Sequence, residues 1–131
     1  MEPIAASEPL SRTILVVDDE ESILDLVSIF LRSEYNIIVA NSGAQALQRS
    51  EQFKGEIHLL LTDSLMPGVN GSDLAVQITL QRPDIKILLM SGSREGLSLQ
   101  AGWHFIAKPF NVSKINKLIT DIFSSRSGTV Q

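Results

Sequence analysis

The sequence predicts a single α/β domain in which a parallel β-sheet is covered by helices on both faces. Short apolar runs, rich in aliphatic and β-branched residues, alternate with segments whose apolar residues recur at helical spacing. Each run is joined to the next by a connection long enough for a helix, as parallel strands require. The 131 residues suffice for one domain with a real core, because chains of this size bury roughly two-thirds of their unfolded surface.

The composition is that of an ordinary globular protein, and it excludes several classes of function. The net charge is −4 and no run of lysine and arginine occurs, which argues against direct binding of nucleic acid. The absence of cysteine excludes a disulfide scaffold and thiolate metal sites. No apolar run approaches the ~20 residues of a membrane span, and the first residues lack the features of a signal peptide. We therefore expect a cytoplasmic protein without a membrane partner.

The first half of the chain is expected to form a leader and two strand–helix units. Two prolines and scattered polar residues predict a flexible leader over residues 1–11. The run 13–17, rich in β-branched residues, is typical of a buried strand, and helical spacing follows over 22–32. Residues 36–40 predict a second strand, and a second helix over 43–53 ends at a Lys-Gly pair.

The second half is expected to repeat this alternation three times. Its apolar runs predict strands over residues 57–62, 85–90 and 104–107. Helices are expected over 72–81 with Ser72 as the N-cap, over 95–100 as a short and weakly specified helix, and from the cap Asn111 onward. The polar residues 125–131 predict a flexible tail, so the domain itself should span residues 12–124.

The order of the strands follows from general rules of connection. Right-handed crossovers in so small a sheet favour the order 2-1-3-4-5, which is the flavodoxin-like (βα)5 doubly wound arrangement. In this order ligands bind at the carboxyl ends of the strands, in the crevice between the first and third strands. Asp18 and Asp19 follow the first strand and Asp63 follows the third. A cluster of three carboxylates is therefore expected in the crevice.

Such a cluster suits a divalent cation. Crowded carboxylates repel one another, so some of them must bind a proton or a cation. Hard oxygen ligands favour Mg²⁺, or Mn²⁺, over Zn²⁺. On its own, the acidic run from Asp18 to Glu20 would indicate an N-terminal cap that interacts with the dipole of the next helix. The presence of Asp63 on a neighbouring strand end favours a metal site instead.

The same edge of the sheet has groups that suit phosphoryl chemistry. Asp63 is the candidate nucleophile, because a carboxylate can attack a phosphoryl group to form an acyl phosphate. The hydroxyl of Ser91 and the ammonium of Lys108 also follow strands, and both can bind phosphoryl oxygens. Taken singly, each has a plain structural interpretation, as a turn residue or a solvated strand end. A cis peptide bond is expected between Lys108 and Pro109.

Four segments carry a resemblance to a known family: residues 14–20 (ILVVDDE), 62–68 (TDSLMPG), 90–92 (MSG) and 105–110 (FIAKPF). They are similar to the motifs of response-regulator receiver domains of bacterial two-component signalling, and they come in the order and close to the spacing of that family. The resemblance covers about residues 12 to 124. It implies a phospho-receiver that accepts a phosphoryl group on Asp63 from a histidine kinase in a Mg²⁺-dependent reaction.

The resemblance also implies a role for each site residue. The implied metal ligands are Asp18, Asp19, Asp63 and the backbone carbonyl of Leu65. Lys108 and Ser91 would contact the phosphoryl group, and Ser91 with Phe105 would form a switch that alters a partner-binding face. Such a domain is not a turnover enzyme, since it catalyses only its own aspartyl phosphorylation and dephosphorylation. The implied partners are a sensor histidine kinase or phosphotransfer protein and a downstream protein target.

The segment between Ser91 and Lys108 departs from the family pattern. It is a few residues shorter than in most receivers, and the deficit falls in the expected fourth helix, where the family builds its usual dimer face. The shortened pattern is more similar to receivers attached to hybrid sensor kinases than to those of transcription factors.

Two other classes of function share these residues. A Mg²⁺-dependent phosphatase-like hydrolase would normally need a second acid two residues after its nucleophile, where Leu65 stands. A pseudo-receiver, which binds partners without phosphorylation, normally lacks one of the acids or the lysine, and all are present here. Fold alone does not decide among the three.

Overall fold

The computed structural model describes residues 12–92 and 102–124 and contains one five-stranded parallel sheet. The strands are β1 (Thr13–Val17), β2 (Asn36–Ala40), β3 (Leu59–Asp63), β4 (Lys86–Ser91) and β5 (His104–Ala107). Their order across the sheet is β2-β1-β3-β4-β5. The flavodoxin-like fold class and the strand order predicted from the sequence are therefore confirmed.

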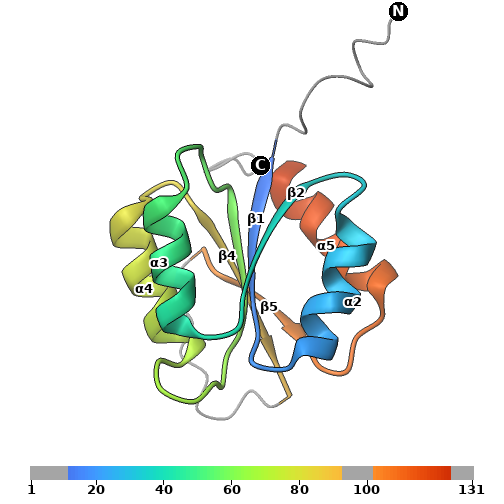
Figure 1. Cartoon of the computed structure of the whole chain (residues 1–131). Helices are drawn as coiled ribbons and strands as arrows, with labels where there is room; N and C mark the ends of the chain where they lie inside the picture. Colours follow the sequence, from blue (N-terminus) through green and yellow to red (C-terminus); the bar gives the residue numbers. More distant parts are fainter. Residues whose placement is uncertain (1–11, 93–101, 125–131) are drawn as a thin grey trace, which may run out of the picture.

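Two layers of helices cover the sheet. The described helices are α2 (Glu21–Leu31), α3 (Gly43–Gln52), α4 (Gly71–Gln81) and α5 (Val112–Ser124). Helices α2 and α5 lie on one face of the sheet, and α3 and α4 lie on the other (Figure 1). Alternate residues of β1 serve the two faces: Ile14 and Val16 pack on the side of α2 and α5, Leu15 and Val17 on the side of α3 and α4. This two-sided burial explains why every residue of the strand after Thr13 is apolar.

The start of α4 differs from the prediction, because two nearby polar residues could each act as its N-cap. Ser72 is not the N-cap of α4. The helix begins at Gly71, and Asn70 caps it by accepting a hydrogen bond from the backbone N–H of Asp73 at 2.9 Å. Asparagine and serine are both good caps, so the prediction of Ser72 was wrong by position and not by chemistry.

The structure tests only part of the remaining predictions. Asn111 caps α5, since its side chain accepts a hydrogen bond from the N–H of Lys114 at 2.7 Å. The bond between Lys108 and Pro109 is cis, as predicted. The predicted leader, the short helix over 95–100 and the tail lie outside the described residues, and the domain limits stay a prediction. In the described parts of the chain no helix is long and apolar enough to cross a membrane.

The side chain of Arg82, which directly follows α4, links α4 to the end of α3 by hydrogen bonds. Its guanidinium donates hydrogen bonds to the backbone carbonyls of Ser50, Phe53 and Gly55 at 2.8, 2.9 and 2.8 Å. A fourth bond of 3.0 Å reaches the hydroxyl of Ser50. Carbonyls at a helix C-terminus lack partners within the helix, so the guanidinium of Arg82 supplies donors to the last turn of α3 and to the residues that follow it.

We expect Arg82→Lys to lower the free energy of unfolding by about 1–3 kcal/mol, because a single ammonium cannot replace the geometry of the guanidinium. Urea denaturation measures the loss. Arg32→Lys, at an exposed arginine after α2, is the matched control and should change stability little. Equal stability of the two variants would contradict the role given to Arg82.

Candidate functional site

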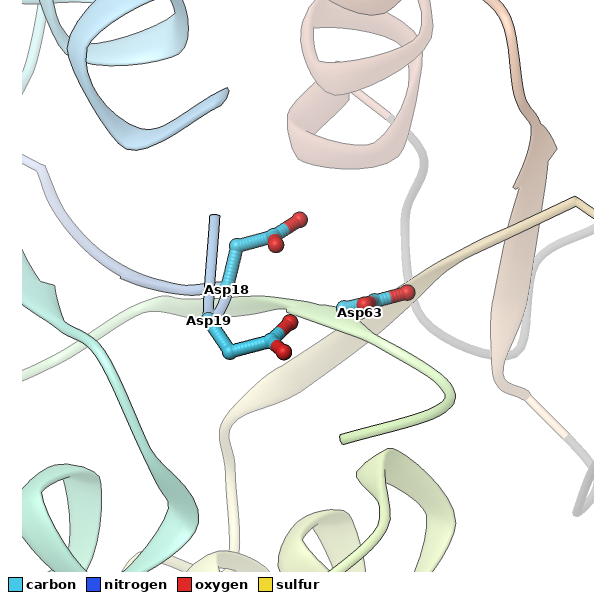
Figure 2. Close-up of side chains that lie close together, drawn as sticks. All are labelled: Asp18, Asp19 and Asp63. Atoms are coloured by element: carbon cyan, nitrogen blue, oxygen red, sulfur yellow. The ribbon is translucent and has the colours of Figure 1, made fainter. Parts of the chain in front are cut away.

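The acidic residues singled out in the sequence meet at the carboxyl edge of the sheet. Asp18 and Asp19 follow β1, and Asp63 is the last residue of β3. One carboxylate oxygen from each of the three lies within 4.8 Å of the other two. Figure 2 shows the three side chains gathered beside the ends of these two strands. The topology therefore brings together groups that are 45 residues apart in the chain (63 − 18 = 45).

The three carboxylates have different environments. Asp18 is fully buried, Asp63 is only 8% exposed, and Asp19 is exposed to solvent. One oxygen of Asp18 accepts a hydrogen bond from the backbone N–H of Glu20 at 2.9 Å. Glu20 is the N-cap residue of α2, yet its side chain makes no capping hydrogen bond. The acidic run thus forms a pocket with a buried wall and an open side, and helix capping alone does not explain it.

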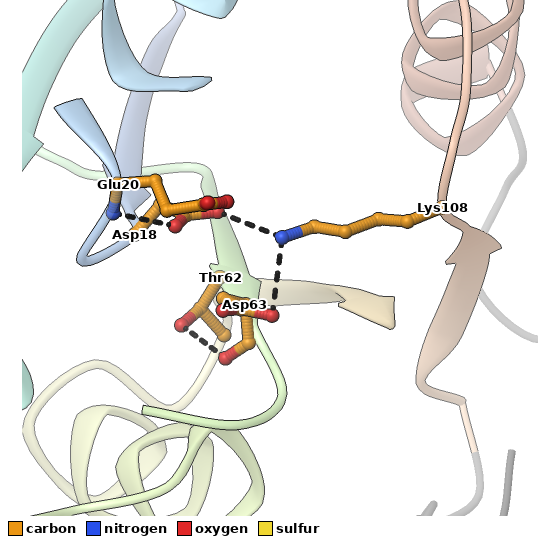
Figure 3. A network of polar contacts seen from close by, with 5 residues as sticks. All are labelled: Asp18, Glu20, Thr62, Asp63 and Lys108. Atoms are coloured by element: carbon orange, nitrogen blue, oxygen red, sulfur yellow. Dashed lines mark hydrogen bonds and ion pairs between the residues drawn. The ribbon is translucent and has the colours of Figure 1, made fainter. Parts of the chain in front are cut away.

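Lys108 reaches into this pocket from the end of β5. Its ammonium lies 3.2 Å from Oδ2 of Asp18 and 3.4 Å from Oδ1 of Asp63 (Figure 3). The backbone N–H of Lys108 donates to the carbonyl of Ser91 at 2.8 Å, which holds the end of β5 against β4. Burial disfavours the charged ammonium, but the Asp18 and Asp63 carboxylates outweigh burial and raise the pKa of Lys108. The lysine therefore stays protonated.

The carboxylate of Asp63 is in an unfavourable environment for its charge. Burial raises its pKa above the ordinary value, and the negative charge of Asp18 raises it further. The ammonium of Lys108 and a hydrogen bond from the backbone N–H of Leu65 lower the pKa but do not cancel the increase. Three carboxylates also face a single ammonium in this pocket, so a bound cation would stabilise it.

This imbalance predicts how stability changes with pH when no metal is bound. Because the pKa of Asp63 is raised on folding, the folded state holds the proton more tightly than the unfolded state, and stability falls as pH rises through that window. We expect Asp63→Asn to remove this part of the fall and to unfold a few degrees higher than the wild type at neutral pH. Thermal unfolding in EDTA, from acid to neutral pH, measures both effects.

Added Mg²⁺ is the control for this prediction. It should stabilise the wild type through binding to the folded state and should stabilise Asp63→Asn less. A metal-free wild type more stable than the variant at neutral pH would contradict the charge imbalance inferred for the pocket.

Of the other predicted site residues, Ser91 lies at the same edge of the sheet as the three acids, whereas Phe105 lines a different pocket. Ser91 is the last residue of β4, at the carboxyl edge of the sheet, and is 2% exposed. It follows Met90, the residue paired with Asp63. Phe105 is half-buried on β5 and lines a pocket with Lys114 and Leu118. The side chain of Leu65 is 71% exposed and points away from the core.

Two backbone contacts of Asp63 had no signal in the sequence. The N–H of Leu65 donates to the Asp63 carboxylate, whereas the family resemblance implies only a role for the carbonyl of Leu65, as a metal ligand. The hydroxyl of Thr62 donates to the backbone carbonyl of Asp63 at 3.0 Å. Residue types alone do not reveal such contacts, because they depend on how the loop after β3 turns.

The fold and the carboxyl-edge cluster define an α/β domain of the receiver type. The model of the response regulator receiver domain family matches residues 14–120, and the chain belongs to this family. The family assignment made from the four sequence motifs is therefore confirmed. Domains of this family are, in general, signalling modules without enzymatic turnover.

The similarity to two relatives supports this family assignment. The chain is 33% identical to the alkaline phosphatase synthesis transcriptional regulatory protein PhoP of Bacillus subtilis, over 86% of this chain and 49% of PhoP. It is 28% identical to the sensor kinase CckA of Brucella abortus, over 88% of this chain and 13% of CckA. The chain therefore spans half or less of each of these relatives.

A solved structure of a receiver domain has the same fold. The CheY-like response regulator receiver domain protein of Methanospirillum hungatei superposes with a TM-score of 0.77 at 28% identity, covering 86% of this chain and 94% of that one.

Proposed function

We propose that this chain is a phospho-receiver that accepts a phosphoryl group on Asp63 from the phosphohistidine of a histidine kinase or phosphotransfer protein. One observation carries the proposal: the Lys108 ammonium lies between the carboxylates of Asp18 and Asp63, and Asp19 completes an acidic pocket on the open side. The carboxylate of Asp63, the candidate nucleophile, thus lies beside a fixed cation and within a group of candidate metal ligands. Membership of the receiver family supports the same role.

The pocket fits Mg²⁺ or Mn²⁺ by the chemistry of its donors. The clustered ligand atoms are all carboxylate oxygens, and the exposed position of Asp19 leaves room for the water molecules that these ions retain. Asp18, Asp19 and Asp63, with the backbone carbonyl of Leu65, are the groups that would hold the ion. When bound, Mg²⁺ would neutralise charge on the transferring phosphoryl group.

The residues of the chain perform the transfer itself. An oxygen of Asp63 forms a bond to phosphorus as the bond from phosphorus to the histidine nitrogen breaks; that nitrogen keeps the electron pair and takes a proton from solvent. Lys108 then pairs with the new phosphoryl oxygens, since its ammonium is already 3.4 Å from Oδ1 of Asp63. Ser91 contacts another phosphoryl oxygen and, through Phe105, alters the face that a downstream protein binds.

This role implies a cytoplasmic module that works through proteins, not through nucleic acid. Its own catalysis is limited to forming and losing the aspartyl phosphate. The proposal is tested by intact mass after incubation with acetyl phosphate and Mg²⁺, with EDTA as the control. We expect a Mg²⁺-dependent gain of about 80 Da, the mass of one phosphoryl group. No gain from acetyl phosphate or from a phosphorylated phosphotransfer protein would favour a pseudo-receiver.

An exposed apolar surface on α2 supports a protein as the phosphoryl donor. Leu26, Ile29 and Phe30 are 48%, 61% and 38% exposed. A groove beside them is lined by Ile23, Leu26, Lys108, Pro109 and Phe110. Because Lys108 belongs to both the groove and the site, a protein seated in the groove brings its own reactive group next to Asp63. We propose that its occupant is the segment of the donor protein that carries the phosphohistidine.

Leu26→Ser should separate this docking from the chemistry. Its labelling by acetyl phosphate should match the wild type, because Leu26 lies outside the acidic pocket. Its labelling by a phosphorylated phosphotransfer protein should be about tenfold slower, as expected for the loss of one apolar contact. Equal rates for the two proteins with both donors would contradict the docking surface.

A further inference from the structure

The loop between β3 and α4 directly follows Asp63. Two glycines, Gly71 and Gly43, lie so close to Asp63 or to this loop that a Cβ atom at either position would clash. We infer that Gly71, supported by Gly43, is a positioning residue that holds the backbone of Asp63 and of this loop in register with the acidic pocket. The inference rests on the proposed phosphoacceptor role of Asp63.

Gly71 makes the closer of the two approaches. A Cβ atom at this position would lie 2.2 Å from the backbone oxygen of Asp63 and 2.8 Å from Cα of Ser64. Cβ atoms essentially never approach another heavy atom within 3.0 Å. The N–H of Gly71 also donates to the carbonyl of Ser64 at 2.9 Å, so the start of α4 is fastened to the end of β3.

Neither side of this contact can move away easily. On one side, Asp63 is paired with Met90 of β4, and its carbonyl accepts the hydroxyl of Thr62 at 3.0 Å (Figure 3). On the other side, α4 is anchored by fully buried Leu74 and Ile78. A side chain at Gly71 must therefore displace the backbone of Asp63 or the first turn of α4.

Gly43 restrains the far end of the same loop. A Cβ atom there would lie 2.8 Å from Cβ of Val69, two residues before Gly71. The obstacle at Gly43 is a side chain in a loop, whereas at Gly71 it is the backbone of a central strand. The effect of a substitution on Asp63 should therefore be larger at Gly71 than at Gly43.

Displacement of Asp63 matters because its carboxylate works through short contacts. Its Oδ1 is 3.4 Å from the ammonium of Lys108, and one of its oxygens lies within 4.8 Å of an oxygen of each of the other two acids. A shift of about 1 Å in a reacting group can lower a rate by roughly a hundredfold. Gly71 thus acts through Asp63 and not through contact with the phosphoryl donor.

The test compares four single variants by rate of labelling with acetyl phosphate and by Mg²⁺ affinity from calorimetry. Gly71→Ala should lower the maximal labelling rate by roughly tenfold or more, and Gly43→Ala should lower it less. Gly55→Ala, whose Cβ would meet only the ring of Phe53 at 3.0 Å, should label like the wild type. Arg82→Lys, which is destabilised far from the site, should also keep the wild-type rate.

These controls separate positioning from stability and from the proposed function. A wild-type rate in Gly71→Ala, or an equal loss in Arg82→Lys, would overturn the inference. If Gly71→Ala does not fold, an unchanged labelling rate and Mg²⁺ affinity in Gly43→Ala would overturn it. If the wild type itself is not labelled, the proposed function fails while Mg²⁺ affinity still tests positioning: weaker binding in Gly71→Ala than in Gly55→Ala supports it, and equal binding contradicts it.

Discussion

Asp63→Asn is expected to abolish the Mg²⁺-dependent gain of one phosphoryl group from acetyl phosphate. The amide of asparagine has nearly the shape of the carboxylate but lacks the negative oxygen that attacks phosphorus. Asp18 also contacts Lys108, but it is fully buried, whereas Asp63 is 8% exposed, so Asp63 is the acid beside the ammonium that a phosphoryl donor can reach. Intact mass spectrometry of the two proteins, incubated side by side, measures the difference.

The matched control for this variant is Asp73→Asn. Asp73 is an exposed acid in the first turn of α4, and removing its charge should leave labelling unchanged. Asp63→Asn should remain folded, and we expect it to be more stable than the wild type without metal. Loss of labelling in a folded protein would then report chemistry and not unfolding. Undiminished labelling of Asp63→Asn would exclude Asp63 as the acceptor and sink the proposed function.

The sequence predicts the fold well because the signals for it are strong and agree with one another. Continuous apolar runs such as 14–17 can be satisfied only by burial on both faces of a sheet, and helix-length connections leave only parallel pairing. Once the strands are parallel, their carboxyl ends must share an edge. The gathering of Asp18, Asp19 and Asp63 follows from topology and does not require knowledge of side-chain positions.

The sequence does not predict the finer details of the site and of the helix ends, because they depend on exact positions along the chain. Whether Asn70 or Ser72 caps α4 depends on where the helix starts within two residues, and both side chains have the needed oxygen. The contrast between buried Asp18 and exposed Asp19 depends on the direction in which the chain leaves β1. The close approach of Gly71 to Asp63 is equally hidden, because a glycine after asparagine resembles an ordinary turn.

Lys108→Met is expected to change metal binding and phosphorylation in opposite directions. The ammonium lies 3.2 and 3.4 Å from two of the acids that would hold Mg²⁺, so the two cations repel each other across the pocket. Removing the lysine charge should tighten Mg²⁺ binding by about tenfold, a cautious figure for charges a few ångströms apart near a surface. The rate of labelling should fall by about a hundredfold, as when a group that stabilises transition-state charge is removed.

Calorimetric titration with Mg²⁺ and the rate of labelling by acetyl phosphate measure the two effects on the same preparation. Lys114→Met, at an exposed lysine of α5, is the control and should change neither quantity. Loss of both metal binding and labelling in Lys108→Met would mean that the lysine only maintains the shape of the pocket. Opposite changes would show that the ammonium opposes metal binding in the resting protein and stabilises the phosphoryl group during transfer. A structural role alone cannot improve metal binding while it impairs labelling.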